Sequence, residues 1–117
     1  GTRREPTERE RELARAIGAV VPFRKPDGRL IPMDWQLITK VAVMATSGVL
    51  AESWVRQAIE AIELNQPPAT ERARYFVTCI KNAIADSRSR IHFGREMYRC
   101  ELPDSWAAKS GASHAVN

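Results

Sequence analysis

The sequence predicts a mainly α-helical domain of four helices, with a short hairpin or a loop near residues 23–31 and a flexible C-terminal tail. Apolar residues recur three and four positions apart in four separate segments, and capping residues, proline or glycine bound these segments. With 44% apolar residues, a chain of 117 residues can bury a core of ordinary size. We therefore expect residues 1–109 to form one domain and residues 110–117 to be disordered.

The same composition bears on where the protein acts. No apolar run approaches the roughly 20 residues that span a bilayer, and the N-terminus carries no signal-peptide pattern. We therefore expect a cytoplasmic protein. The opening Gly1-Thr2 is typical of an expression scar, which suggests a domain cut from a longer protein.

The first predicted helix covers about residues 8–20. Thr7 and Glu10 have the spacing of a capping box, and apolar residues follow at helical spacing from Leu13 onward. A Pro-Asp-Gly turn then separates two short extended arms. Basic side chains around this turn suit either a wing-like phosphate contact or simple solubility: Arg24, Lys25 and Arg29.

Two further helices follow the turn. Asp34 is expected to cap the second helix, the Ser47-Gly48 pair to end it, and the third helix to cover about residues 50–64. The side chains of the second helix expected to face the core are Trp35, Ile38, Val41, Ala42 and Ala45. Those of the third are Leu50, Trp54, Val55, Ala58, Ile59 and Ile62.

The fourth predicted helix is the longest, at about residues 71–90. Two prolines at 67 and 68 interrupt the preceding helix, and Thr70 is expected to cap this one. Its apolar side consists of Tyr75, Phe76, Cys79, Ile80, Ala83 and Ile84. After Phe93-Gly94 the periodicity fades, and Pro103 to Trp106 suit one more helical turn.

The Ser47-Gly48 turn between two helices is compatible with a DNA-binding helix-turn-helix over residues 34–64. In such a motif the glycine adopts positive φ and the second helix presents a short polar row to the major groove. That row consists of Glu52, Ser53, Arg56 and Gln57. An ordinary helical hairpin joined by a tight turn produces a similar string of residues, so both interpretations stay open.

The positive charge of the chain is concentrated in residues 71–99. The chain carries a net charge of +4, and this segment holds seven basic side chains against three acidic ones, which accounts for the whole excess. The basic residues are Arg72, Arg74, Lys81, Arg88, Arg90, Arg95 and Arg99. A local excess of this kind attracts phosphates, although basic residues are also common on exposed helices.

Residues 88–95 interleave basic and aromatic groups. This mixture is typical of segments that grip a single strand by charge and stacking. In the alternative interpretation, Ile91 and Phe93 dock the segment back on the core.

Two segments within residues 50–90 resemble a known family. They read Trp54-Val55-x-x-Ala58-Ile59-Glu60-x-Ile62 and, after a proline-containing break, Arg74-Tyr75-Phe76-Val77-x-x-Ile80-Lys81-Asn82. This arrangement resembles the C-terminal helical domain of DnaD-type primosomal proteins and related phage or plasmid replication initiators. In that family an aromatic residue is followed by Ile four positions later and Trp four after that; Phe76 and Ile80 fit, whereas position 84 is Ile. The resemblance implies a module that binds DNA and bridges to the replicative helicase.

The sequence gives no support for catalysis, a metal or a cofactor. The two histidines, His92 and His114, have no partner that would make a nucleophile and base. Cys79 and Cys100 do not have zinc-ligand spacing, and Cys79 is expected to be a reduced thiol on an apolar helix face. We therefore expect a protein without enzymatic activity.

Two functions follow from these patterns. The first is a DNA-binding domain of a replication initiator, helicase loader or similar nucleoprotein factor, with DNA, duplex or single-stranded, and replication proteins such as a helicase as partners. The second is a helical protein-interaction module of a larger assembly. The residues expected to contact nucleic acid are Arg56, Gln57, Arg72, Arg74, Lys81, Arg88, Arg90 and Arg95.

Overall fold

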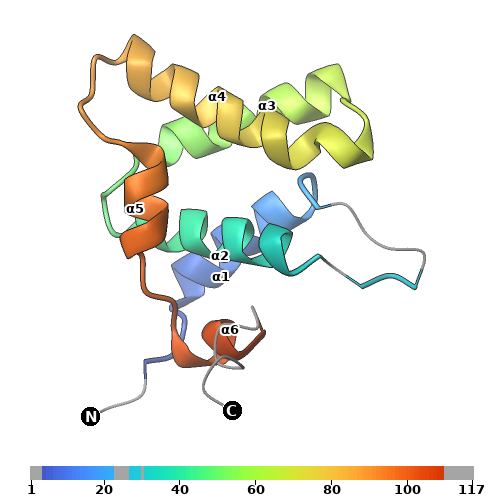
Figure 1. The fold of residues 1–117 in the computed structure, drawn as a ribbon, viewed down its shortest axis with the longest axis vertical. Coiled ribbons are helices and arrows are strands. Elements are labelled where there is room, and N and C mark those ends of the chain that lie inside the picture. Colours follow the sequence, from blue (N-terminus) through green and yellow to red (C-terminus); the bar gives the residue numbers. More distant parts are fainter. Residues whose placement is uncertain (1–3, 23–26, 30, 110–117) are drawn as a thin grey trace.

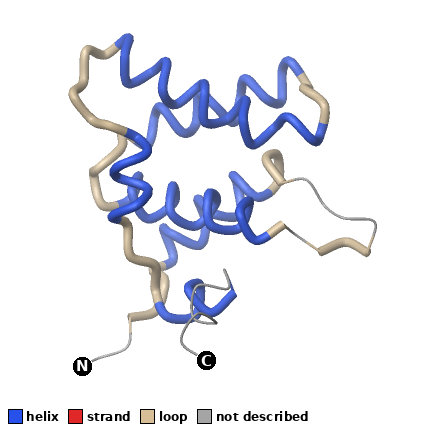
Figure 2. Tube along the Cα trace, in the orientation of Figure 1, coloured by secondary structure: helices blue, strands red, loops and turns tan. Residues whose placement is uncertain are grey.

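A computed structural model describes residues 4–22, 27–29 and 31–109. Within these ranges the chain forms six α-helices and one 3-10 turn, and no strand (Figure 2). The elements are α1 Glu8–Gly18, α2 Pro32–Thr46, α3 Glu52–Asn65, η1 Ala69–Glu71, α4 Arg72–Asp86, α5 Phe93–Arg99 and α6 Asp104–Lys109. The predicted mainly helical fold is confirmed, but the number of helices exceeds the predicted four.

The helices are arranged as two pairs. α1 packs along α2, and α3 packs antiparallel to α4 above them (Figure 1). α5 stands at one side and connects the two pairs, while α6 lies beneath α2. α2 is the central element, since it contacts α1, α3, α5 and α6.

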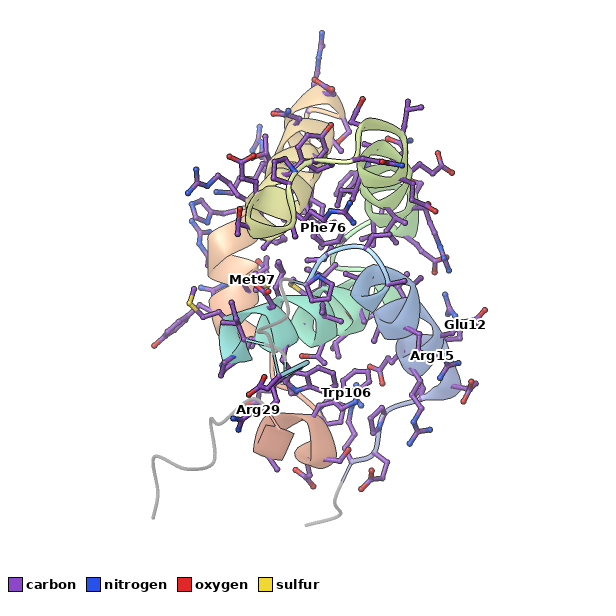
Figure 3. All side chains as sticks on the ribbon, turned by 90° about the vertical axis from the view of Figure 1, so that its right-hand side faces the viewer. Glu12, Arg15, Arg29, Phe76, Met97 and Trp106 are labelled. Atoms are coloured by element: carbon purple, nitrogen blue, oxygen red, sulfur yellow. The ribbon has the colours of Figure 1, made fainter. Side chains whose placement is uncertain are left out.

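The core lies between the two pairs. Phe76 of α4 is fully buried there, below α3 and α4 (Figure 3). The apolar stripes predicted for the second and third helices point inward, with Val41, Val55 and Ile62 fully buried. The two tryptophans of these stripes, Trp35 and Trp54, are only half-buried and pack against the core.

The predicted capping box at the start of α1 is confirmed. The Thr7 hydroxyl accepts from the Glu10 amide at 3.1 Å, and the Glu10 carboxylate accepts from the Thr7 amide at 2.8 Å. Arg4 also donates to this buried carboxylate, with 3.1 Å between Nη1 and Oε1. Burial raises the pKa of Glu10, but the bonds from Arg4 and Thr7 outweigh it and hold the pKa below its ordinary value.

Two predicted caps are wrong. α2 begins at Pro32, two residues before Asp34, because proline has no amide to satisfy and its fixed φ suits the first helical position. Asp34 lies in the first turn of α2 and is buried. Before α4, the chain forms the 3-10 turn that includes Thr70, so Glu71 takes the N-cap position without a side-chain bond.

Of the predicted ends of α2 and α4, the first is confirmed and the second is wrong. α2 ends at the predicted Ser47-Gly48 pair, where Gly48 has φ of 89° and the Val49 amide donates to the Met44 carbonyl at 2.9 Å. α4 is shorter than predicted, because a similar turn ends it at Asp86 rather than at residue 90.

The segment after α4 forms two helices, of which only α6 was predicted, as a single turn. The first residue of α5, Phe93, is buried in the core. His92 is the N-cap of this helix, and its Nδ1 accepts from the Arg95 amide at 3.0 Å. The predicted hairpin falls largely on residues 23–26 and 30, which lie outside the described residues, as does the predicted tail at 110–117; residues 27–29 form a turn.

Candidate nucleic-acid interface

Arg74 and Lys81 form a basic row along the exposed side of α4. They are seven residues apart, which is about two helical turns, so both side chains project from the same face. Both are exposed, and neither forms an ion pair with any residue that the structure describes. Ala85 lies on the same face one turn after Lys81. This row is therefore available to an external anion.

A groove of about 410 Å³ runs beside this row. Its lining comes from α4, from the start of α2 and from Met97 of α5. The groove is lined by apolar side chains such as Leu37 and Val77, by the two cations Arg74 and Lys81, and by the acidic Asp34. The groove thus combines apolar side chains with two cations and one carboxylate.

Arg88 is a third basic residue, just beyond the end of α4. The Ser89 amide donates to the Ile84 carbonyl at 3.1 Å, and the Arg88 amide to the Ala85 carbonyl at 3.0 Å. This pair of bonds ends the helix in a Schellman motif, with Arg88 at the position that usually holds glycine. Arg88 has φ of 58°, a left-handed conformation that is unfavourable for a residue with a Cβ. Its side chain is exposed.

The basic residues of the next segment form a separate group. Arg90, Arg95 and Arg99 are exposed, and the last two are one turn apart on α5. Met97 is two positions from each of them and faces the groove, so Arg95 and Arg99 project to the other side of α5. Lys40 holds α5 in place, since its Nζ donates to the Met97 carbonyl at 2.9 Å.

The aromatic residue in the basic segment is not available for stacking. Phe93 is buried in the core and Ile91 is half-buried against it. The docking interpretation of residues 88–95 is therefore confirmed for Ile91 and Phe93.

Arg72 has a structural role in this fold. Its Nε donates to the Pro67 carbonyl at 3.0 Å, and its Nη1 donates to the Val20 carbonyl at 3.1 Å. The guanidinium thus ties the α3–α4 connection to the end of α1. It is half-buried and already has two acceptors, which sets it apart from Arg74 and Lys81.

Arg56 and Gln57 lie away from the basic row. Arg56 Nε is 3.4 Å from Glu52 Oε2, and Arg9 of α1 reaches the other oxygen of Glu52 at the same distance. Gln57 lines a shallow hollow between α3 and α4 with Asn82 and Asp86. The exposed side of α3 also carries Glu60 and Glu63, so the polar row of the predicted helix-turn-helix is surrounded by acids.

The basic residue that is described near the α1–α2 turn is also paired. Arg29 Nε lies 2.8 Å from Asp27 Oδ2, so its charge is balanced locally. Arg24 and Lys25 of the predicted wing lie outside the described residues.

In the part of the chain that the structure describes, no three His, Cys, Asp or Glu side chains come together in a way that could hold a metal ion. Cys79 and Cys100 are both free and half-buried, and burial raises the pKa of each thiol. A thiol that stays protonated is a poor nucleophile. None of the described helices has the length and apolar character needed to cross a membrane.

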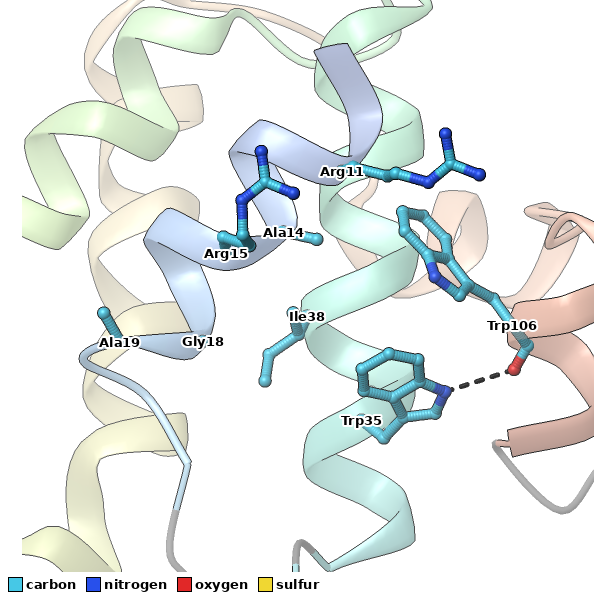
Figure 4. A pocket seen from close by; sticks show the side chains of 8 residues that line it. All are labelled: Arg11, Ala14, Arg15, Gly18, Ala19, Trp35, Ile38 and Trp106. Carbon is cyan, nitrogen blue, oxygen red and sulfur yellow. Dashed lines mark hydrogen bonds between the residues drawn. The ribbon is translucent and has the colours of Figure 1, made fainter. Parts of the chain in front are cut away.

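A second groove, which no sequence pattern predicts, lies between α1, α2 and α6. It is lined by two tryptophans far apart in the chain, Trp35 and Trp106, and by two arginines of α1 (Figure 4). Only the packing of α6 against α2 brings these groups together, so no local pattern could predict it. No family model, curated protein or solved structure matches the chain.

Proposed function

We propose that this domain binds DNA through the exposed side of α4 and the chain that leaves it. The observation that carries the proposal is the α4 row with Arg88 after it, three exposed cations that have no ion pair within the described residues. Arg90 follows directly and is also exposed. Cations arranged along one helix and its exit attract the regularly spaced phosphates of a nucleic-acid backbone.

Several exposed arginines elsewhere in the described residues are paired, whereas Arg11 of α1 and Arg95 and Arg99 of α5 are, like this row, without an ion pair. Arg15 pairs with Glu8 at 3.1 Å, and Arg9 and Arg56 share Glu52. A paired surface cation contributes little to an external field, whereas unpaired cations of one sign add up. The unpaired cations of α4 and of the chain that leaves it therefore add to one positive field.

The conformation of Arg88 supports the same proposal. Glycine would fit its left-handed backbone without strain, yet the chain places an arginine there. Strained backbone positions occur preferentially at functional sites. A role for the Arg88 side chain in binding explains why this helix end does not carry glycine.

The proposed contact positions the backbone of the nucleic acid and does not read its sequence. Arg56 and Gln57 are the residues suited to base edges, but docking α3 into a major groove would bring Glu52, Glu60 and Glu63 toward phosphates. We therefore place the main interface on α4, and the helix-turn-helix interpretation takes second place.

The biological setting rests on the resemblance of residues 50–90 to DnaD-type replication proteins. That resemblance suggests a DNA-binding domain of a replication initiator, helicase loader or similar nucleoprotein factor, acting in DNA replication. The geometry of α4 bears only on polyanion binding, so the two parts of the proposal are tested separately.

The test of DNA binding is a titration of duplex and single-stranded oligonucleotides at two salt concentrations. Replacing Lys81, Arg88 and Arg90 with alanine should weaken binding to all sequences alike, because phosphate contacts are lost. For duplex DNA the slope of log affinity against log salt should fall by about 0.9 per lost contact.

Two matched variants serve as controls. Arg9→Ala and Arg15→Ala each remove an arginine that is paired in the structure, and both should leave the salt slope close to that of the wild type. If the wild-type domain shows no salt-dependent binding to either form of DNA, the proposal is wrong. If Arg56→Ala or Gln57→Ala changes sequence preference, α3 reads bases and the helix-turn-helix interpretation takes first place.

A further inference from the structure

The groove between α1, α2 and α6 has the features of a binding site that is separate from the α4 row. Its volume is about 550 Å³, within the range of about 300 to 1,000 Å³ typical of ligand sites. Three small residues form one wall, namely Ala14 and Gly18 of α1 and Ala19 directly after it (Figure 4). Because these side chains are short or absent, the groove is open along that helix.

Two tryptophans form the opposite wall. Their rings meet edge to face, with centroids 6.2 Å apart and planes at 84°. Trp35 Nε1 donates to the Trp106 carbonyl at 3.1 Å, so this indole N–H is satisfied within the protein (Figure 4). Ile38 completes the apolar lining. The wall therefore offers an apolar surface that suits a large apolar side chain.

The charged groups at the groove have a single sign. Arg11 and Arg15 line it, and no acidic residue does. Arg11 forms no ion pair with the residues that the structure describes. Arg15 pairs with Glu8 at 3.1 Å, but both side chains are largely exposed, so this pair is weak and can exchange. A ligand that matches this groove therefore carries an anionic group beside an apolar one.

We propose that this groove binds a segment of a partner protein that inserts a large apolar side chain against Trp35 and Trp106. Carboxylates on the same segment then pair with Arg11 and Arg15. The site does not depend on DNA binding by α4, since its lining shares no residue with the α4 groove.

The lining favours a peptide over a nucleic acid. A base inserted in the groove would bring ring N–H and carbonyl groups, which need polar partners when they are buried. The side chains of the lining offer guanidinium donors and no carboxylate, amide or hydroxyl acceptor. An aliphatic or aromatic side chain has no such requirement, and flanking carboxylates match the two arginines.

Gly18 provides a way to block the groove without disturbing the fold. It lies in the last turn of α1, and a Cβ added there would meet no atom within 4 Å. Gly18→Leu should therefore fill the groove, whereas Gly18→Ala adds one methyl group and serves as the matched control. Both substitutions favour the helix over glycine.

The experiment selects peptides from a displayed random library on the wild-type chain, with Gly18→Leu as the counter-selection. The selected peptides should share an aromatic or large aliphatic residue next to Asp or Glu. A selected peptide without tryptophan should change the emission of the protein's tryptophans, because two of them line the groove.

Affinities of that peptide then test each part of the site. Gly18→Leu and Arg11→Glu should each weaken binding at least about tenfold, while Gly18→Ala should stay within about threefold of the wild type. Thermal unfolding of each variant checks that it is folded, and the exposed Arg11→Glu variant tests the site even if Gly18→Leu is unstable.

Three results would overturn the proposal. The first is a selection that enriches no common motif, or one without acidic residues. The second is peptide binding that Gly18→Leu and Arg11→Glu leave unchanged. The third is a loss of oligonucleotide binding in these two variants, which would assign the groove to nucleic acid. Failure of DNA binding by the wild type leaves this proposal standing, so the two proposals fail separately.

Discussion

α2 and α4 have the same length of 15 residues but opposite relations to solvent. Nine residues of α2 are buried and only three of α4, so α2 is enclosed on most sides while α4 is anchored along one stripe. A helix enclosed in this way has few positions left for ligand contacts. The positions open to an external ligand therefore lie on α4 and its exit, where we propose the DNA contact.

The ends of these two helices make the same point. Each helix is followed by a turn that contains one residue in the left-handed conformation. This residue is Gly48 after α2 and Arg88 after α4. Glycine adopts this conformation without a steric penalty, whereas a residue with a Cβ does not. The turn after α2 thus carries the residue that suits the left-handed conformation, whereas the turn after α4 carries an exposed, charged side chain.

The largest effect that separates the two helices should come from one added charge. Ala42 of α2 is fully buried, so Ala42→Glu should destabilise the protein by roughly 4 kcal/mol or more, because a carboxylate enters the core without a partner. Ala85 of α4 is exposed, and Ala85→Glu should change stability by less than about 0.5 kcal/mol. Urea unfolding of both variants measures the difference. Similar losses would show that α4 is enclosed as α2 is.

A smaller effect should measure the single stripe that anchors α4. Phe76 is fully buried, so Phe76→Ala should destabilise the protein by about 3 to 5 kcal/mol. Trp54 is only half-buried, and Trp54→Ala should cost about 2 kcal/mol despite its larger ring. Chemical unfolding ranks the two variants, and a larger loss for Trp54 would mean that the core is centred at α3.

Which positions of the helices are buried can largely be predicted from the sequence, because burial follows the periodicity of apolar residues. The inward positions of the second, third and fourth helices were identified from apolar spacing, and residues such as Val41, Ile62 and Phe76 are buried as predicted. The capping box at Thr7 also holds, since both of its partners lie within four residues. Local signals of this kind do not depend on how distant segments pack.

Predictions from the sequence were wrong or missing where the structure depends on contacts between distant residues or on competition between capping residues. Asp34 looked like a cap, but Pro32 starts the helix earlier. α5 has only seven residues, too few for helical periodicity to stand out. Arg72 looked like a phosphate ligand, and only the fold places Val20 against its guanidinium. The groove at Trp35 and Trp106 likewise joins residues that no local pattern connects.

The smallest predicted effect concerns the left-handed residue after α4. Its replacement by glycine should raise the stability of the protein and weaken DNA binding. Arg88→Gly should stabilise the protein by about 0.5 to 1 kcal/mol, because glycine relieves the left-handed backbone at some cost in chain entropy. The same variant should weaken DNA binding and lower the salt slope for a duplex by about 0.9, because one phosphate contact is lost. Thermal unfolding and oligonucleotide titration measure the two effects on one protein sample.

Two further variants separate the backbone of Arg88 from its side chain. Arg88→Ala keeps the left-handed strain and loses the charge, so it should weaken binding as much as Arg88→Gly does, without the gain in stability. Gly48→Ala introduces the same strain after α2 and should destabilise the protein by about 1 kcal/mol while leaving DNA binding unchanged. If Arg88→Gly gained stability and kept full affinity, the strain at this helix end would have no connection with DNA. The proposed DNA contact on α4 would then rest on Arg74 and Lys81.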